Sequence, residues 1–277
     1  MPISINTNIS SLNAQRNLTT SQNALATSLQ RLSSGLRINS AKDDAAGLFI
    51  VEKQTADIRG LNQAVRNAAD GISLGQTAEG ALGQVSGFIQ RIREIAVQSA
   101  NATVQDRTGL QAEVDQLTQE ISRIVDTTEF NGTALLSAAS SLNFQVGQDG
   151  TSNNQVTVST ALLTGLNTYD ANLTGTGTVD VSTAVNAATA LALLDADIDT
   201  VSTNRATFGA VQNRFESVIA NLQNYAENLT ASRSRIQDAD FAAETANLVK
   251  NQILQQAGVS ILAQANTLPQ SALLLLQ

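Results

Sequence analysis

The longest regular pattern in the chain is an apolar residue at every seventh position between residues 194 and 229. These positions hold Leu194, Val201, Phe208, Phe215, Leu222 and Leu229. A second apolar stripe follows three or four residues later, at Ile198, Val211, Val218, Ile219 and Tyr225. A seven-residue apolar repeat is typical of a helix that supercoils against another helix. We therefore predict one helix over about residues 183–230, roughly 70 Å long at 1.5 Å per residue.

The first segment, residues 5–34, also has the spacing of a helix with one apolar seam. The seam residues are Leu18, Leu25, Leu29, Leu32 and Leu36. Gly35 is placed to end this helix, because glycine readily adopts the left-handed conformation of a helix C-terminus. After a short linker, Ser40 is followed three residues later by Asp43, which resembles a capping box that opens the next helix.

Two further helices are predicted before the middle of the chain. The second continues to about residue 100, and the third covers residues 106–127. The second helix changes the phase of its apolar stripe where glycines gather, at Gly71, Gly75, Gly80, Gly83 and Gly87. We expect close helix packing or a local irregularity there.

The middle of the chain changes character. Apolar residues alternate with polar ones around a turn-rich stretch at residues 147–150, which predicts a β-hairpin. They are Leu142, Phe144, Val146, Val156 and Val158. The Phe130-Asn131-Gly132 stretch predicts a turn, and residues 164–183 are expected to be irregular. The fold class is therefore mainly α, with long antiparallel helices that form a coiled-coil-like rod and a small β-hairpin region in the middle.

The last segment, from residue 236, is predicted to be helical to about residue 266 and to carry two apolar faces. One stripe contains Val249, Ile253, Ala257 and Ile261, and the other contains Phe241, Leu248, Val259 and Leu262. Four leucines at 273–276 add to this apolar end. A surface helix of a monomer needs only one apolar face. Two faces favour a helix between its own chain and neighbouring subunits, and the alternative is a helix buried in a monomeric bundle.

Composition and charge narrow the function further. The chain has no Cys and no His, so the common thiol, zinc and acid–base arrangements are excluded, and we expect no enzyme and no cofactor. Between Arg123 and Arg205 there is no Lys or Arg, whereas eight of the 24 acidic residues lie there. This acidic middle argues against a nucleic-acid partner. Among these acids we expect Asp195, Asp197 and Asp199 to form a solvated face and not a cation site.

Neither a membrane span nor a secretory signal is evident. No apolar run approaches the length that crosses a bilayer, so we expect no membrane insertion. The first charged side chain is Arg16, and no apolar stretch of the signal-peptide kind follows it, so a cleaved signal is not expected.

Several motifs in the right order resemble those of bacterial flagellins. They occupy residues 5–8, 32–47, 67–73, 95–101, 130–132, 231–236 and 238–242. The resemblance covers about residues 1–137 and 184–277, and the chain looks like a minimal flagellin with a short middle. It divides the chain into an N-terminal inner-core helix and linker (residues 1–39) and a helical rod in two parts (residues 40–137 and 184–235). A short outer region (residues 138–183) separates the two parts of the rod, and a C-terminal inner-core helix (residues 236–277) ends the division.

The resemblance implies a subunit that polymerises with itself into the extracellular flagellar filament. It also implies export by the flagellar type III apparatus without a cleaved signal. The partners it implies are an export chaperone at the C-terminal segment and the filament cap and hook-junction proteins. Contacts for polymerisation are expected at Leu25, Leu29, Leu32, Phe241, Leu248, Val249, Ile253, Val259 and Leu262.

Arg91, Ile95 and Glu113 match positions by which the host innate immune receptor recognises many flagellins. Arg91 and Ile95 are four residues apart on one helix, so we expect them to share a face. The alternative is an ordinary contact between subunits. For the whole chain, two other functions stay open: a hook–filament junction protein, and a soluble helical signalling rod similar to the cytoplasmic part of a chemoreceptor.

Overall fold

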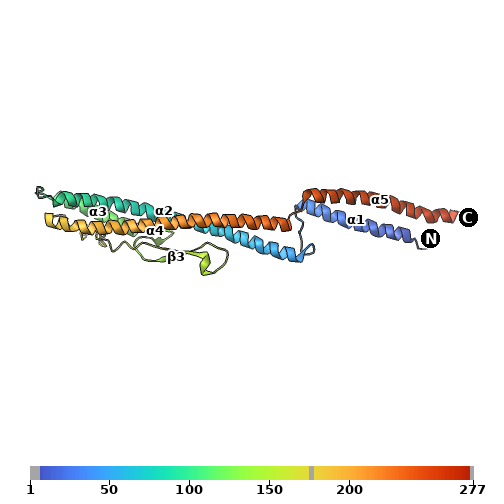
Figure 1. Ribbon diagram of the computed structural model, residues 1–277, viewed down its shortest axis with the longest axis horizontal. Helices are drawn as coiled ribbons and strands as arrows, with labels where there is room; N and C mark the ends of the chain where they lie inside the picture. The colour runs from blue at the N-terminus through green and yellow to red at the C-terminus, as the bar shows by residue number, and fades with distance from the viewer. Residues whose placement is uncertain (1–6, 175–177, 275–277) are drawn as a thin grey trace. The chain divides into compact units, whose positions relative to one another are not determined.

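The computed structural model describes residues 7–174 and 178–274, and its fold is mainly α as expected (Figure 1). The helices are α1 (Ile9–Ser34), α2 (Ala45–Ala100), α3 (Thr108–Thr127), α4 (Ala184–Gln237) and α5 (Phe241–Leu274). Short strands lie between α3 and α4: β1 (Glu129–Phe130), β2 (Thr133–Ala134), β3 (Ser141–Gln145) and β4 (Gln155–Ser159), with one 3-10 turn, η1 (Ser152–Asn154).

The chain divides into two compact units. One comprises residues up to 56 together with those from 227 onward, and the other comprises residues 57–226. The first therefore contains α1, α5, the first turns of α2 and the last turns of α4. The second contains most of α2 and α4, all of α3 and the four strands.

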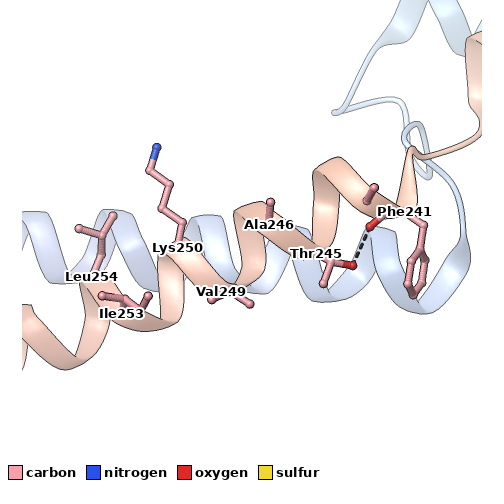
Figure 2. Close-up of a pocket in the computed structure, with 8 residues that line it drawn as sticks. Phe241, Thr245, Ala246, Val249, Lys250, Ile253 and Leu254 are labelled. Atoms are coloured by element: carbon pink, nitrogen blue, oxygen red, sulfur yellow. Dashed lines mark hydrogen bonds between the residues drawn. The ribbon is translucent and has the colours of Figure 1, made fainter.

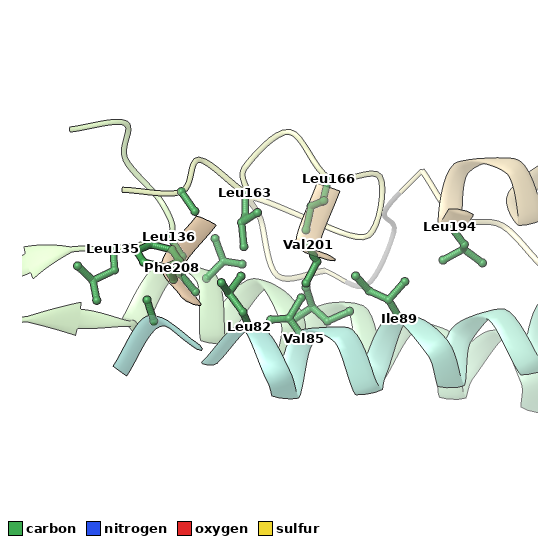
Figure 3. Close-up of a cluster of buried hydrophobic side chains, with 14 of the residues drawn as sticks. Leu82, Val85, Ile89, Leu135, Leu136, Leu163, Leu166, Leu194, Val201 and Phe208 are labelled. Atoms are coloured by element: carbon green, nitrogen blue, oxygen red, sulfur yellow. The ribbon is translucent and has the colours of Figure 1, made fainter. Parts of the chain in front are cut away.

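In the second unit, α2 and α4 run antiparallel and are joined by ion pairs. Arg93 pairs with Asp195 at 2.7 Å, and Arg205 pairs with Glu79 at 2.8 Å. The predicted seven-residue seam of α4 is confirmed: Leu194, Val201, Phe208 and Phe215 are buried, whereas Leu222 and Leu229 are half-buried. Figure 3 shows how Val201 and Phe208 of α4 meet Leu82, Val85 and Ile89 of α2. The helix continues to Gln237, past the expected end near residue 230.

The glycine cluster of α2 produces close packing at two positions and no break in the helix. A Cβ on Gly71 would lie 2.5 Å from the Phe215 ring, and one on Gly75 would lie 3.0 Å from the Gln212 side chain. At Gly80, Gly83 and Gly87 a Cβ would have no neighbour within 4 Å. Only the first two glycines are therefore required by the approach of α4.

The start of α2 differs from the prediction. The helix begins at Ala45, and Asp44 caps it by accepting a hydrogen bond of 2.8 Å from the Gly47 backbone N–H. Asp43 instead closes the preceding turn, because its Oδ2 accepts backbone N–H bonds from Ser40 and Asn39. The hydrogen bond from the Ser40 backbone N–H, and to a smaller extent that from Asn39, lowers the pKa of Asp43 below its usual range. The capping-box assignment was wrong because two adjacent aspartates satisfy different backbone groups.

The predicted turn at residues 130–132 and the predicted β-hairpin are both confirmed. β1 and β2 form a hairpin whose turn residues, Asn131 and Gly132, have φ of 49° and 76°, as a two-residue hairpin loop of the primed type requires. In the second hairpin Leu142 pairs with Val158 and Phe144 with Val156. Val156 and Val158 are buried in the core of the second unit, so this hairpin packs against the helices.

The segment after β4, residues 160–181, has no helix or strand among its described residues but is held firmly to the helices. Leu163 and Leu166 are buried in the core (Figure 3). The Asp197 carboxylate of α4 accepts backbone N–H bonds from Asn167 at 3.0 Å and from Thr168 at 2.8 Å. It also accepts bonds from the Asn167 amide and the Thr168 hydroxyl, each at 2.9 Å. Asp197 is thus buried, and the expectation of a solvated face is wrong for this residue because the loop donates into it.

A candidate assembly surface on the terminal helices

In the first unit, α1 and α5 lie side by side and antiparallel (Figure 1). Two contacts far apart along the pair define this register. The Asn8 amide donates to the Ala265 carbonyl at 2.8 Å, and Arg31 faces Glu244 at 3.8 Å between Nη1 and Oε2. On the sides of α1 and α5 that turn toward each other, only small or polar residues are fully buried: Ser11, Ala14 and Ser28 from α1 and Glu244 and Ala265 from α5. The larger leucines of this contact are half-buried: Leu18, Leu25, Leu32, Leu248 and Leu262.

The segments that join these helices to α2 and α4 are bonded to one another. Gly35 ends α1 in the left-handed conformation, with φ of 72°, and its N–H bonds the Arg31 carbonyl at 2.8 Å. Its carbonyl accepts the Ala239 N–H at 2.9 Å, and the Arg37 N–H donates to the Gln237 carbonyl at 2.7 Å. The predicted helix end at Gly35 is confirmed, and backbone hydrogen bonds hold the two linking segments together.

The large apolar residues of both helices point mainly to the surface. On α5, Phe241 is 66% exposed and Ile253 is 60% exposed. The other exposed members are Val249, Leu254, Val259 and Ile261 on α5 and Ile9, Leu12 and Leu29 on α1. Contiguous exposed apolar surface of this kind marks an interaction site on a soluble protein. The pair therefore fully buries only small or polar residues, half-buries several leucines and leaves a larger set of apolar side chains exposed.

A hollow of about 850 Å³ lies on the exposed side of α5 near its start. It is lined by Phe241, Ala242, Thr245, Ala246, Val249, Lys250, Ile253 and Leu254. Figure 2 shows Lys250 pointing away from Val249 and Ile253. Lys250 is the only charged side chain among the lining residues, so the hollow suits an apolar occupant.

The residues expected to take part in polymerisation divide into two groups. Leu29, Phe241, Val249, Ile253 and Val259 are exposed, whereas Leu25, Leu32, Leu248 and Leu262 are half-buried. The first predicted stripe of α5 is exposed throughout. The second does not form one face toward the chain itself, because Phe241 and Val259 lie at its exposed edge while Leu248 and Leu262 turn inward. Helix α5 continues to Leu274, past the expected end near residue 266, and Leu275 and Leu276 lie outside the described residues.

The expected receptor contacts occupy two different environments. Arg91 donates to Glu113 at 2.8 Å and to Glu94 at 3.0 Å, and all three side chains are exposed. The hydrogen bond with Glu113, followed by that with Glu94, raises the pKa of Arg91 above its usual value. Ile95 is only 1% exposed and belongs to the hydrophobic core. The expectation that Ile95 shares an exposed face with Arg91 is therefore wrong, because α2 turns Ile95 toward the core.

Other kinds of site find no support in the described ranges. Within residues 7–174 and 178–274, no group of three or more acidic residues is placed to hold a metal ion. Over the same ranges, no helix is long and apolar enough to cross a membrane.

Sequence reasoning missed several exposed apolar residues, chiefly Ile9, Leu12, Phe49, Ile50 and Leu254. Phe49 and Ile50 precede Val51, which is buried. The run of four adjacent apolar residues from Leu48 to Val51 was the available signal, because a helix cannot bury all four on one face.

Comparisons with known proteins agree on one family. A family pattern described as the bacterial flagellin N-terminal helical region matches residues 5–141, and one described as the C-terminal helical region matches residues 191–276. A flagellin of Halalkalibacterium halodurans is 45% identical over 276 residues, which cover 99% of each chain. A flagellin of Bacillus subtilis is 41% identical, again over 99% of each chain.

A solved structure, titled as a putative flagellar hook-associated protein from Vibrio parahaemolyticus, is similar in fold. Its TM-score is 0.58 at 15% identity, and the match covers 71% of this chain and 100% of that one. At this identity the likeness concerns the fold alone.

Proposed function

Since the chain belongs to the bacterial flagellin family and is a structural subunit of the extracellular flagellar filament, we propose that the exposed faces of α1 and α5 are where copies contact each other. The observation that carries this proposal is the set of large apolar side chains that the helix pair leaves exposed, while it fully buries only small or polar residues. The high identity to flagellins over nearly the full length favours the filament subunit over a hook–filament junction protein or a signalling rod.

The energetics support an interface on these faces. Full burial of one large apolar side chain stabilises by roughly 1.5–3 kcal/mol relative to full exposure. Six such side chains on α5 are about half exposed or more. Covering them by neighbours would therefore contribute several kcal/mol, whereas the single chain leaves this free energy unrealised.

An assembly assay with charged substitutions tests the proposal. The double variant Val249→Glu with Ile253→Glu should fold as a monomer but fail to elongate seeds, because both side chains are exposed in the single chain. Leu162→Glu, at an equally exposed apolar residue of the second unit, is the matched control and should still polymerise. Pellets of normal size from the double variant would refute the proposal.

The unassembled subunit requires further partners under the same proposal. An export chaperone would cover the α5 face before assembly, because an exposed apolar strip promotes aggregation. The filament cap and hook-junction proteins would meet the same terminal helices at the two ends of the polymer. Export by the flagellar apparatus without cleavage of a signal belongs to this proposal as well, and family membership supports it.

Recognition by the host innate immune receptor is proposed at Arg91 and Glu113 only. The two side chains form an exposed, mutually oriented pair across α2 and α3. An aligned guanidinium and carboxylate can each bind a polar partner of a receptor surface. Ile95 acts in this proposal as a core residue that fixes the turn of α2 carrying Arg91.

A further inference from the structure

Two neighbouring side chains near the start of α2 lie outside every contact proposed so far. Phe49 is 73% exposed and Ile50 is 45% exposed, although the next residue, Val51, is buried. Phe49 has the highest exposed fraction of any aromatic side chain among the described residues. Aromatic side chains with this exposure are typical anchors of protein interfaces. Phe49 and Ile50 together form a small exposed apolar projection near the start of α2.

The hollow on α5 has the form that accepts such a projection. Its lining contains two overlapping sets of four residues at helical positions i, i+3, i+4 and i+7. The first set is Ala242, Thr245, Ala246 and Val249, and the second is Ala246, Val249, Lys250 and Ile253. In helix packing, such a set of four is the hole that receives one side chain of a facing helix. Two alanines belong to the first set, so its side chains leave room for a large side chain of a facing helix.

We propose that Phe49 and Ile50 of one copy insert into the α5 hollow of the next copy in the filament. This inference rests on the proposed function, because it names the surface that covers part of α5. A projection and a hollow on different surfaces of one chain make a heterologous contact, which propagates as an open helical filament when the rotation between copies does not close a ring. That is the geometry that a helical filament requires and that a closed dimer lacks.

Charge supports the same occupant. Glu52 and Lys53 follow Phe49 by one helical turn and are exposed, so an acidic side chain is available beside the projection. Lys250 is the only charged residue that lines the hollow. The register in which Glu52, and not Lys53, approaches Lys250 of the other copy is therefore the one that charge favours.

Disulfide trapping tests the contact directly, because the chain contains no cysteine. A disulfide requires Cα atoms within about 7 Å. Chains with Phe49→Cys and chains with Ile253→Cys are mixed, polymerised on seeds and oxidised. We expect covalent dimers in the mixture and none in filaments of either variant alone. Val185→Cys in place of Phe49→Cys is the control and should give none. Normal filaments without mixed dimers would overturn the contact, as would dimers formed by Leu12→Cys in place of Phe49→Cys.

A quantitative assay separates this contact from the wider proposal. Phe49→Ala should raise the critical concentration for polymerisation about tenfold, with the melting temperature of the monomer unchanged because Phe49 is exposed. Val185→Ala, at another highly exposed apolar residue, should change neither quantity. If Phe49→Ala polymerises normally while the Val249→Glu/Ile253→Glu variant does not, this contact is refuted and the proposed function stands. If both variants polymerise normally, the proposed function fails as well.

Discussion

Phe215 is the residue at which the packing of α2 against α4 can be tested most sharply. Its side chain is fully buried, and its ring meets that of Phe144 edge-on, with centroids 5.4 Å apart and planes at 79°. Truncation of a buried Phe to Ala costs about 3–5 kcal/mol of unfolding free energy. The lost aromatic pair accounts for about 0.5–1.5 kcal/mol of this. We expect Phe215→Ala to lower the unfolding free energy of the monomer within that range.

Gly71, which faces the Phe215 ring, allows a second test, in which the packing predicts the sign of a change in unfolding free energy. A Cβ on Gly71 would lie 2.5 Å from the Phe215 ring, so Gly71→Ala should destabilise the otherwise unchanged chain by about 1–3 kcal/mol through overpacking. After Phe215→Ala the ring is gone. The same glycine substitution should then stabilise by about 1 kcal/mol, because alanine favours the helix over glycine. The effect of Gly71→Ala therefore changes sign with residue 215.

Urea unfolding of the four chains, followed by circular dichroism on the monomer, measures this cycle. Gly80→Ala is the matched control, because a Cβ there meets nothing within 4 Å. It should stabilise by about 1 kcal/mol with either residue at position 215. The same effect of Gly71→Ala in both backgrounds would refute the packing of Phe215 on Gly71.

Three other predictions concern side chains outside the α2–α4 seam. Asp197→Ala should destabilise the monomer by about 2 kcal/mol or more, because Asn167 and Thr168 lose a buried acceptor; Asp195→Ala, which removes an exposed ion pair, should cost less than about 1 kcal/mol. Burial, followed by the hydrogen bond to Asp126, raises the pKa of Tyr169, so in a Tyr225→Phe chain the remaining phenol should ionise above the usual value near 10. The contribution of the protonated Tyr169 phenol to stability is complete below about pH 10 and is lost as pH rises through the folded-state pKa. Coinciding absorbance titration curves of the folded and the urea-unfolded chain would contradict this. Arg91→Ala and Glu113→Ala should each weaken receptor binding by about 1 kcal/mol or more, and unchanged affinity of both folded monomers would remove the proposed recognition.

The helices could be predicted from the sequence because their apolar spacing is long and regular. The seam from Leu194 to Phe215 is buried where the seven-residue repeat placed it. Gly35 ended α1 as expected because only a few residues adopt positive φ without strain. The Asn131-Gly132 turn was predictable for the same reason.

The departures from prediction come from contacts between distant segments. Periodicity alone did not show that Ile95 faces the core, since its neighbour Arg91, one turn away, lies at the exposed edge. Nor did it show that the loop carrying Asn167 and Thr168 lies on Asp197, because a polar loop leaves no apolar pattern. On α5 the sequence predicted two apolar faces. The burial of Glu244 and Ala265 against α1 was missed, because a hydrophobic pattern does not single out a carboxylate or a small residue.

Hydrogen exchange of monomer and filament tests the central claim that neighbouring subunits complete the terminal helices. The α1–α5 pair buries mainly small and polar residues of its own chain, and helices of this kind gain most of their stability from packing of the apolar face. Amides of residues 9–34 and 241–267 should therefore exchange rapidly in the monomer and slowly in the filament. Amides of α2 around Val85 and Ile89, in the core of the second unit, should be protected in both states. Equal protection of α1 and α5 in monomer and filament would contradict the account.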